Sequence, residues 1–241
     1  MNRRVAASMA ATLLALGAAI VVFGKTGLDI WLQDHFFNFS TGQWRVDRDA
    51  KLPRLLFYDG PKVLIIILAA ASLAYLLCPS AWRPRWLHLP WERPQLWVLL
   101  LSLAVVPMTI TTWRGGSAHH CPWALTRYGG SHPYHRLLDP TPVEAKTNCG
   151  RCFPAGHASG GFALMSLAFV LRRRWLGLGI GLFFGWMMGV YQMLKGAHFL
   201  SHTVVTMIAA WLLIELVALI VSCIAKRKQT SAPEPAAPPP G

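Results

Sequence analysis

Charged residues are scarce in this chain, and acidic residues are the scarcest among them. Only 14% of the 241 residues are charged, with 10 Asp and Glu against 23 Lys and Arg, whereas a soluble domain normally carries about a quarter charged residues. Hydrophobic residues make up 54% of the chain, and its mean hydropathy is +0.40. The composition therefore excludes an ordinary soluble domain and indicates a membrane protein.

Features of nucleic-acid and nucleotide binding are also lacking. The formal charge of +13 comes from basic residues that are scattered between apolar runs and do not line one polar face. No nucleotide-binding loop is implied anywhere in the chain. We therefore expect no nucleic-acid partner, and we expect membrane lipids with anionic headgroups as the partners of the basic residues.

Six apolar segments are candidates for membrane spans, which need about 20 largely apolar residues. The first follows Arg3 and Arg4 like a signal peptide, but it has no small-residue cleavage site, so we interpret it as a retained anchor. The fourth is short and starts with small residues. The six segments are Val5–Phe23, Val63–Cys78, Leu96–Trp113, Ala158–Leu171, Leu176–Leu194 and Phe199–Ile224.

These segments predict an all-α membrane protein with about six transmembrane helices in a bundle. Residues 1–224 form a single domain in this interpretation. Residues 225–241 are expected to be a disordered cytoplasmic tail, because the chain from Gln229 onward is rich in Pro and Ala and has nothing to bury.

The basic residues favour one orientation in the membrane. Short connections that contain Arg83, Arg85 and Arg172–Arg174 are nearly free of carboxylates, and such connections usually face the cytoplasm. Eight of the nine histidines then fall on the outer side. We therefore predict a multi-pass protein of a bacterial inner membrane whose histidine-rich face is periplasmic.

Three outer segments contain the candidate functional residues, and topology brings all three to one membrane face. They are Trp113–Trp123, Cys152–Ser159 and Tyr191–His202. Phosphoryl transfer needs cationic and N–H donors around the phosphate, a nucleophile in line, and an acid for the leaving oxygen. The three segments together supply residue types for each of these roles.

The second and third segments carry the residues that suit this chemistry best. His157 follows Gly156 just ahead of a helix, where free N–H groups and the positive dipole end bind an anion. His198 and His202 are four residues apart, so one ring can attack while the other accepts its second N–H and fixes the tautomer. The available cations are Arg114, Arg151 and Lys195.

These segments resemble the motifs of the type 2 phosphatidic acid phosphatase superfamily over roughly residues 60 to 222. The family's first motif is Lys, six residues, Arg-Pro, and here Arg114 is followed after six residues by Cys121–Pro122. The second motif, Pro-Ser-Gly-His, is matched by Pro154–His157, with Ala in place of Ser. The cation of the first motif is kept as Arg, while its second cation and the serine hydroxyl are lost.

The third motif of the family is Ser-Arg, five residues, His, three residues, Asp. It is matched by Tyr191–Gln192, five residues, His198, three residues and His202, so the spacing is intact while Arg and Asp are replaced. The resemblance implies that His198 is the nucleophile that forms a phosphohistidine. It further implies that His157 is the general acid for the leaving lipid alkoxide and that His202 orients His198.

The resemblance also implies where the phosphate is bound. Because the positions of two family cations hold Cys121 and Gln192, we expect Arg114 and the backbone at Gly156 to bind the phosphate. Replacement cations would come from nearby positions in the chain. The two candidates for this role are Lys195 and Arg151. The family chemistry requires no metal and no cofactor.

The remaining histidines and the cysteines have plainer interpretations. A lone histidine near a helix end is usually structural, so we expect the histidines of residues 119–135 only to line the approach to the site. For the site histidines His157, His198 and His202 a metal site is the alternative, since imidazole is a common zinc ligand, but no nearby carboxylate completes a set. The histidines that we interpret as structural are His119, His120, His132 and His135.

The five cysteines divide by position in the chain. On the oxidising outer side, Cys121 and Cys152 each adjoin a site motif and are candidates for a disulfide, with Cys149 as the competing partner. The single C-x-x-C at residues 149–152 is weak evidence for redox or metal work. Cys78 and Cys223 lie near inner helix ends and are expected to remain thiols.

Glu215 lies within the sixth apolar segment, where an ionisable side chain is costly. Such a residue is a functional suspect by default, but snorkelling or pairing between helices explains it equally well. We assign it no site role.

The sequence thus predicts an integral membrane lipid phosphate phosphatase that hydrolyses a phosphomonoester or pyrophosphate of a lipid. By family analogy its substrate is a molecule such as undecaprenyl pyrophosphate, phosphatidylglycerophosphate, phosphatidic acid or a lipid A phosphate. Two alternatives remain open. One is a lipid phosphotransferase, and the other is a non-catalytic phospholipid-binding or transport protein, which the replaced motif residues allow.

Overall fold

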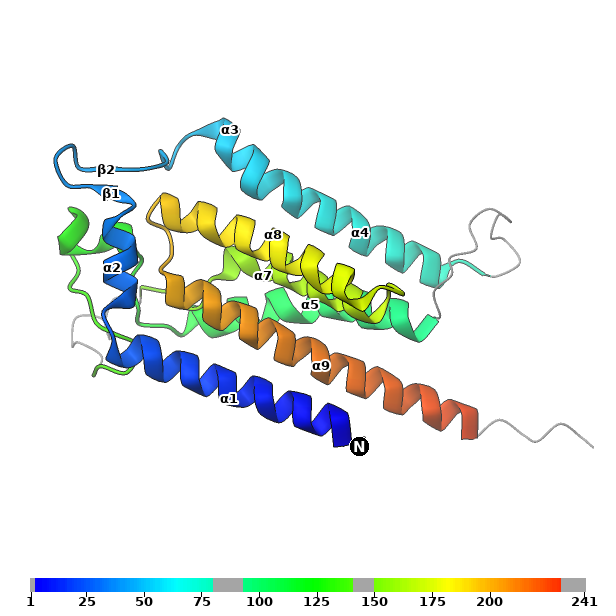
Figure 1. Ribbon diagram of the computed structural model, residues 1–241. Helices are drawn as coiled ribbons and strands as arrows, with labels where there is room; N and C mark the ends of the chain where they lie inside the picture. Colours follow the sequence, from blue (N-terminus) through cyan, green and yellow to red (C-terminus); the bar gives the residue numbers. More distant parts are fainter. Residues whose placement is uncertain (1–2, 80–92, 141–149, 231–241) are drawn as a thin grey trace, which may run out of the picture.

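A computed structural model describes residues 3–79, 93–140 and 150–230, which form a bundle of long helices with short elements gathered at one end (Figure 1). The amino terminus of α1 (Arg3–Lys25) and the carboxyl terminus of α9 (Leu200–Thr230) lie at the other end. The end that carries the short elements also carries the three outer segments of the sequence. We call it the outer end of the bundle.

Within the described residues, five helical stretches are long and apolar enough to cross a membrane, which confirms the prediction of an all-α membrane bundle. Besides α1 and α9, they comprise α5 (Arg93–Gly115), α8 (Arg174–Leu194) and the stretch Lys51–Leu77. This last stretch is continuous through α3 (Lys51–Arg54), a π-helical turn (Leu55–Asp59) and α4 (Gly60–Leu77).

The fourth predicted segment is shorter than a span and lies inside the bundle. It begins as α7 (Gly156–Ala163) and continues as a 3₁₀ helix (Leu164–Phe169). Phe162 of α7 is fully buried and packs in the main hydrophobic core with residues of α5 and α9, among them Ile110 and Ile214. Other helices surround this segment and shield it from lipid, so it does not need the length of a lipid-facing span.

Glycines allow α8 to touch the backbones of α7 and of the 3₁₀ helix that follows it. A Cβ on Gly161 would lie 2.6 Å from the backbone nitrogen of Gly185, and a Cβ on Gly181 would overlap the backbone of Met165. Small residues permit such close helix packing in membranes, where van der Waals contact replaces the hydrophobic effect as the driving force. The contact holds the start of α7, and hence His157, in a fixed position against α8.

A short helix, α2 (Leu28–Asp34), ties the outer ends of α8 and α9 together. The buried carboxylate of Asp29 accepts a 2.8 Å hydrogen bond from the backbone N–H of Ser201 in the first turn of α9. The side-chain amide of Gln33 donates to the carbonyl of Met193 at 2.8 Å. The turn between α8 and α9, which carries His198, is therefore braced from outside.

A small hairpin and an ion pair extend this outer layer. Strands β1 (Phe37–Asn38) and β2 (Gln43–Trp44) pair in antiparallel fashion. Aromatic rings of both strands contact Tyr128 of the loop that follows α5, at centroid distances of 5.1 to 5.2 Å. In the same loop, Arg127 donates to both carboxylate oxygens of Asp34, at 2.8 and 2.6 Å.

Glu215 joins α1 to α9 within the bundle. Its carboxylate accepts hydrogen bonds from the hydroxyl groups of Ser8 and Thr12, the latter at 3.1 Å. A buried polar side chain is tolerated where it has such hydrogen-bond partners. Of the explanations open for this residue, pairing between helices is the one that these contacts support.

Helix α9 continues beyond the predicted end of the sixth segment, as far as Thr230. Lys226 and Arg227 lie in its last turns, where positive charge interacts favourably with the carboxyl end of the helix dipole. The rest of the predicted tail, residues 231–241, lies outside the described residues.

Candidate active site

Three histidines form a chain of contacts at the outer end of the bundle. Nδ1 of His157, in the first turn of α7, shares a 2.9 Å hydrogen bond with Nε2 of His198. Nδ1 of His198 lies 3.3 Å from Nδ1 of His202, in the first turn of α9. Both ring nitrogens of His198 therefore face another imidazole, and the structure brings all three predicted catalytic residues together.

A cavity of about 250 Å³ opens beside the first pair of these rings. His157 and His198 both line it, together with Arg114 at the carboxyl end of α5 and Lys195 at the end of α8. His202 is not among its lining residues and is buried behind His198, with 1% of its surface exposed. The cavity thus combines two imidazoles with three cations, the third being Arg48, and one carboxylate, Asp49. Its positive charges outnumber the negative one, which suits a phosphate group.

Gly156 places the start of α7 against Arg114. A Cβ at this position would lie 3.6 Å from Cδ and 3.7 Å from Nε of Arg114. The guanidinium therefore lies close to the amino end of α7, whose free N–H groups and dipole favour an anion.

A sharp turn sets Lys195 and His198 beside the cavity. Gly196 has a φ of +72°, and a Cβ there would overlap the ring of Trp44, so only glycine fits without strain. The carbonyl of Gly196 accepts a 2.9 Å hydrogen bond from the backbone N–H of Trp123. The hairpin and the loop after α5 thus hold this turn from two sides.

The two loops that precede the site are joined to each other. The backbone N–H of Cys152 donates to the carbonyl of His119 at 3.1 Å, and that of Arg151 donates to Ser117 at 2.9 Å. A disulfide links Cys121 to Cys152, which confirms this pairing over the alternative that involves Cys149. Cys149 lies outside the described residues.

Burial sets the protonation of the central histidine. His198 is fully enclosed, so burial lowers its pKa well below the usual value, and the neighbouring His157, His202 and Arg114 act in the same direction. His198 is therefore a neutral imidazole at physiological pH, which is the form a nucleophile needs. Burial also lowers the pKa of Lys195, with Arg54 and Arg48 contributing.

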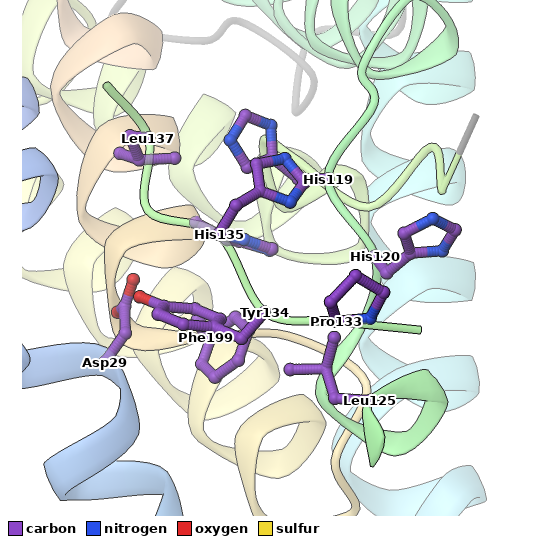
Figure 2. A pocket seen from close by; sticks show the side chains of 10 residues that line it. Asp29, His119, His120, Leu125, Pro133, Tyr134, His135, Leu137 and Phe199 are labelled. Carbon is purple, nitrogen blue, oxygen red and sulfur yellow. The ribbon is translucent and has the colours of Figure 1, made fainter. Parts of the chain in front are cut away.

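Four of the other outer histidines form a second cluster, and three of them, His119, His120 and His135, line a much smaller cavity (Figure 2). Rings stack in two pairs, His119 with His135 at 4.6 Å and His120 with His132 at 3.8 Å between centroids. The cavity has a volume of about 10 Å³, room for about one water molecule. Asp29 and His202 also line it, so it lies between the outer surface and the back of the active site.

A family model described as the PAP2 superfamily, the type 2 phosphatidic acid phosphatases, matches residues 95–226. The match covers more than half of the chain. The chain belongs to the PAP2 superfamily. No curated protein and no solved structure matches it.

Membership in the PAP2 superfamily indicates phosphatase action on phosphate esters. The matched region contains all three motif segments and ends within α9. Where the family motif has Arg, Gln192 lines the cavity, and where it has a second cation, Cys121 lines the cavity as half of the disulfide. Both positions remain at the site even though neither side chain is charged.

The cavity differs from the prediction from sequence at two arginines, Arg151 and Arg48. Arg151 is exposed and is not among the residues that line the cavity, so its role in phosphate binding stays a prediction. Arg48, from the loop after β2, does line it, and its guanidinium lies 4.3 Å from the ring centre of Trp123. No motif marks Arg48; the only sequence signal is a group of basic residues between Arg45 and Arg54.

Proposed function

We propose that this protein is a membrane lipid phosphate phosphatase that works through a phosphohistidine at His198. The observation that carries the proposal is the 2.9 Å contact between His157 and His198 beside a cavity that Arg114 and Lys195 also line. Two imidazoles this close can act on the same phosphate group, one as the nucleophile that attacks phosphorus and the other as the acid that protonates the leaving oxygen. The cations offset the charge of the phosphate oxygens.

In the first step, Nε2 of His198 attacks phosphorus and forms a P–N bond, while the bond between phosphorus and the ester oxygen breaks. The electron pair of that bond leaves with the oxygen, and His157 donates its proton to it. A phosphate dianion beside His157 favours the protonated form that this donation requires. The product is a lipid alcohol, or a lipid monophosphate when the substrate is a pyrophosphate.

In the second step, water attacks the phosphohistidine. His157, now neutral, takes up a proton from the water, the P–N bond breaks, and inorganic phosphate leaves. His202 acts behind the reaction, because its Nδ1 lies 3.3 Å from the Nδ1 of His198 and accepts the proton that His198 carries there. This arrangement keeps the lone pair of His198 on Nε2, toward the cavity.

An apolar groove beside the site supports a lipid substrate. It has a volume of about 510 Å³, lies between the Lys51–Leu77 stretch and α8, and is lined by residues that include Phe57, Trp186 and Tyr191. The Tyr191 ring lies 4.8 Å from Nζ of Lys195, which lines the active-site cavity. An acyl or prenyl chain in this groove would place its phosphate near the two cations.

The disulfide supports the predicted location. Disulfides persist in oxidising compartments such as the bacterial periplasm, and the Cys121–Cys152 bond lies at the end of the bundle that contains the site. We therefore place the active site at the periplasmic face of an inner membrane.

Purified protein in detergent should release inorganic phosphate from phosphatidic acid or from a prenyl pyrophosphate, and His198→Ala should not. Equal phosphate release by both proteins would rule out the mechanism. Recovery of the phosphate on an added lipid alcohol would identify a phosphotransferase. Lipid binding that survives His198→Ala, with no phosphate release by the unmodified protein, would identify a non-catalytic binding protein.

A further inference from the structure

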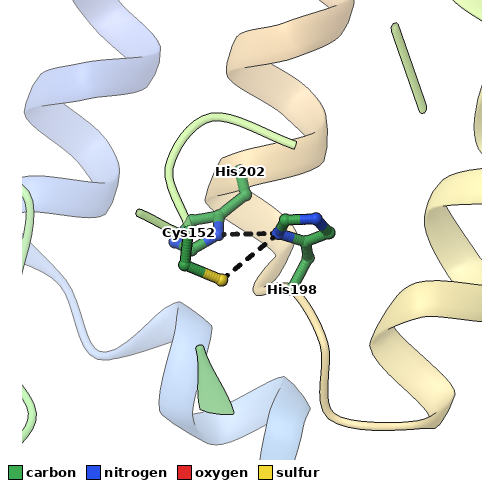
Figure 3. A group of neighbouring side chains, drawn as sticks. All are labelled: Cys152, His198 and His202. Carbon is green, nitrogen blue, oxygen red and sulfur yellow. Dashed lines mark hydrogen bonds between the residues drawn. The ribbon is translucent and has the colours of Figure 1, made fainter. Parts of the chain in front are cut away.

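Cys152, His198 and His202 meet behind the active-site cavity (Figure 3). Sγ of Cys152 lies 3.5 Å from Nδ1 of His198, which in turn lies 3.3 Å from Nδ1 of His202. One potential ligand atom from each residue lies within 4.8 Å of the other two. All three side chains are buried, with 0% exposure for Cys152 and 1% for each histidine.

Two of the three separations match the spacing of ligands around a tetrahedral zinc ion, and the third, between Cys152 and His202, is within 4.8 Å. Bonds of about 2.0 Å to nitrogen and about 2.3 Å to sulfur separate tetrahedral ligands by roughly 3.3 to 3.6 Å. The two short separations, 3.3 Å between nitrogens and 3.5 Å between nitrogen and sulfur, fall in this range. Two imidazoles and one thiolate form a ligand set that zinc accepts while keeping a fourth position open to water.

The disulfide withholds this ligand set in the oxidised protein, because the sulfur of Cys152 is bonded to Cys121 and is not a thiolate. We propose that reduction of the Cys121–Cys152 disulfide creates a zinc site of Cys152, His198 and His202, and that zinc bound there inactivates the enzyme. Reduction takes two electrons and two protons from a dithiol, which is itself oxidised to a disulfide. The Cys152 thiol then loses its proton to solvent as the sulfur–zinc bond forms.

Zinc on Nδ1 of His198 would disable the nucleophile through its tautomer. Attack on phosphorus needs a lone pair on Nε2 and a proton on Nδ1. A metal on Nδ1 needs the lone pair of Nδ1, so the single ring proton moves to Nε2, which faces His157, and no lone pair remains there for attack. This inactivation rests on the proposed phosphatase function, whereas metal binding by the three side chains does not.

Metal binding is tested first, in protein whose Cys78, Cys149 and Cys223 are replaced by Ser, so that Cys121 and Cys152 are its only cysteines. Cobalt(II) serves as the probe because its bonds to thiolate give a strong near-ultraviolet absorption band. We expect the band after reduction with a dithiol and its loss when zinc is added. The oxidised protein should give no band.

A matched pair of variants locates the sulfur ligand. Cys121→Ser and Cys152→Ser both lack the disulfide, and each keeps one thiol, but only Cys121→Ser retains the sulfur beside His198. Cys121→Ser should bind cobalt without a reductant, and Cys152→Ser should give no thiolate band. An equal band in both variants, or none in either variant and in the reduced protein, would overturn the proposed site.

His202→Ala tests the third ligand and should weaken cobalt binding by the reduced protein about tenfold or more. Each protein should elute as a single detergent-bound species, which shows that loss of binding is not loss of folding. Unchanged affinity in His202→Ala would remove this residue from the site.

Phosphate release provides the second readout. Zinc at about ten times its dissociation constant should lower the rate of the reduced protein about tenfold and leave the oxidised protein unchanged. If the oxidised protein releases no phosphate, the proposed function fails while the cobalt titration still decides the metal site. If the oxidised protein is active and zinc leaves the reduced protein equally active, the proposed inactivation is wrong.

Discussion

Two groups of histidines lie at the outer end of this bundle, and they differ in what surrounds them. The site histidines, His157, His198 and His202, come from α7, the turn after α8, and α9. The loop histidines come from residues 119–135 and stack in two pairs. Contact between imidazoles is therefore common to both groups and does not by itself mark a catalytic site.

Cations and access separate the two groups. Two of the site histidines, His157 and His198, border a cavity of about 250 Å³, and His202 lies behind His198. Three cations, Arg48, Arg114 and Lys195, and one carboxylate, Asp49, also line this cavity. Three of the loop histidines, His119, His120 and His135, border a cavity of about 10 Å³. Among the described residues that line it, Asp29 is the one carboxylate, and there is no Lys or Arg. A phosphate group fits the first setting by size and charge, while the second has room for about one water molecule.

The sharpest test of this difference is to remove one ring from each group. His198→Ala should lower kcat/KM for a lipid phosphate about 10⁴-fold or more, because no other group among the described residues replaces a covalent nucleophile in that position. His132→Gln, in the loop group, should change it less than about threefold, since its ring lies apart from the cavity. Comparable losses in the two variants would erase the distinction.

Loss of the general acid should depend on the leaving group. His157→Asn should lower the rate with a lipid alkoxide about 10³-fold, because that oxygen needs a proton as it departs. With p-nitrophenyl phosphate, whose leaving group is stable without a proton, the loss should be about tenfold or less. Equal losses with both substrates would mean that His157 only positions the phosphate.

The sequence predicted the parts of this site that depend on local pattern. Apolar runs identify the spans, and the spacing of His198 and His202 places both in the same turn region. Arg48 and Arg151 show where this reasoning ends, because whether a loop cation lines the cavity depends on the fold of the outer loops. That fold rests on contacts between distant residues, such as Asp29 with Ser201, which no local pattern reveals.

The position of the fourth apolar segment inside the bundle also depends on contacts that no local pattern reveals. Hydropathy alone cannot tell a lipid-facing span from a helix enclosed by others, since both are apolar. The close approach of Gly161 to Gly185 shows that this segment packs against another helix. The sequence contains both glycines but does not show that they are partners.

The cations that line the cavity should contribute less than His157 and His198 but more than the loop histidines. Arg114→Gln should lower kcat/KM about 10²-fold, as expected for removing one preorganised donor from a phosphoryl-transfer site. Arg151→Gln is the matched control, because Arg151 is exposed and does not line the cavity. A loss in Arg151→Gln as large as in Arg114→Gln would show that the outer loop moves to bring Arg151 to the phosphate.

The smallest expected effect is on the pH dependence of protein stability, and it comes from the loop histidine His119. Burial, with a contribution from His135, lowers the pKa of His119 from 6.5 to about 4. The unfolded chain therefore takes up a proton below pH 6.5 that the folded protein resists, so stability is lost as the pH falls from 6.5 toward 4. Asp29 opposes this trend, because burial raises its pKa to about 6 and its charge is costly above that pH.

His119→Gln removes the first effect and keeps the second. The fall in stability between pH 6.5 and pH 4 should become smaller by about 2 kcal/mol in this variant, while phosphatase activity at neutral pH changes little. Thermal unfolding in detergent at several pH values measures the first quantity, and phosphate release measures the second. If His119→Gln instead lowered activity as strongly as Arg114→Gln, the small cavity behind His202 would have to be counted as part of the catalytic site.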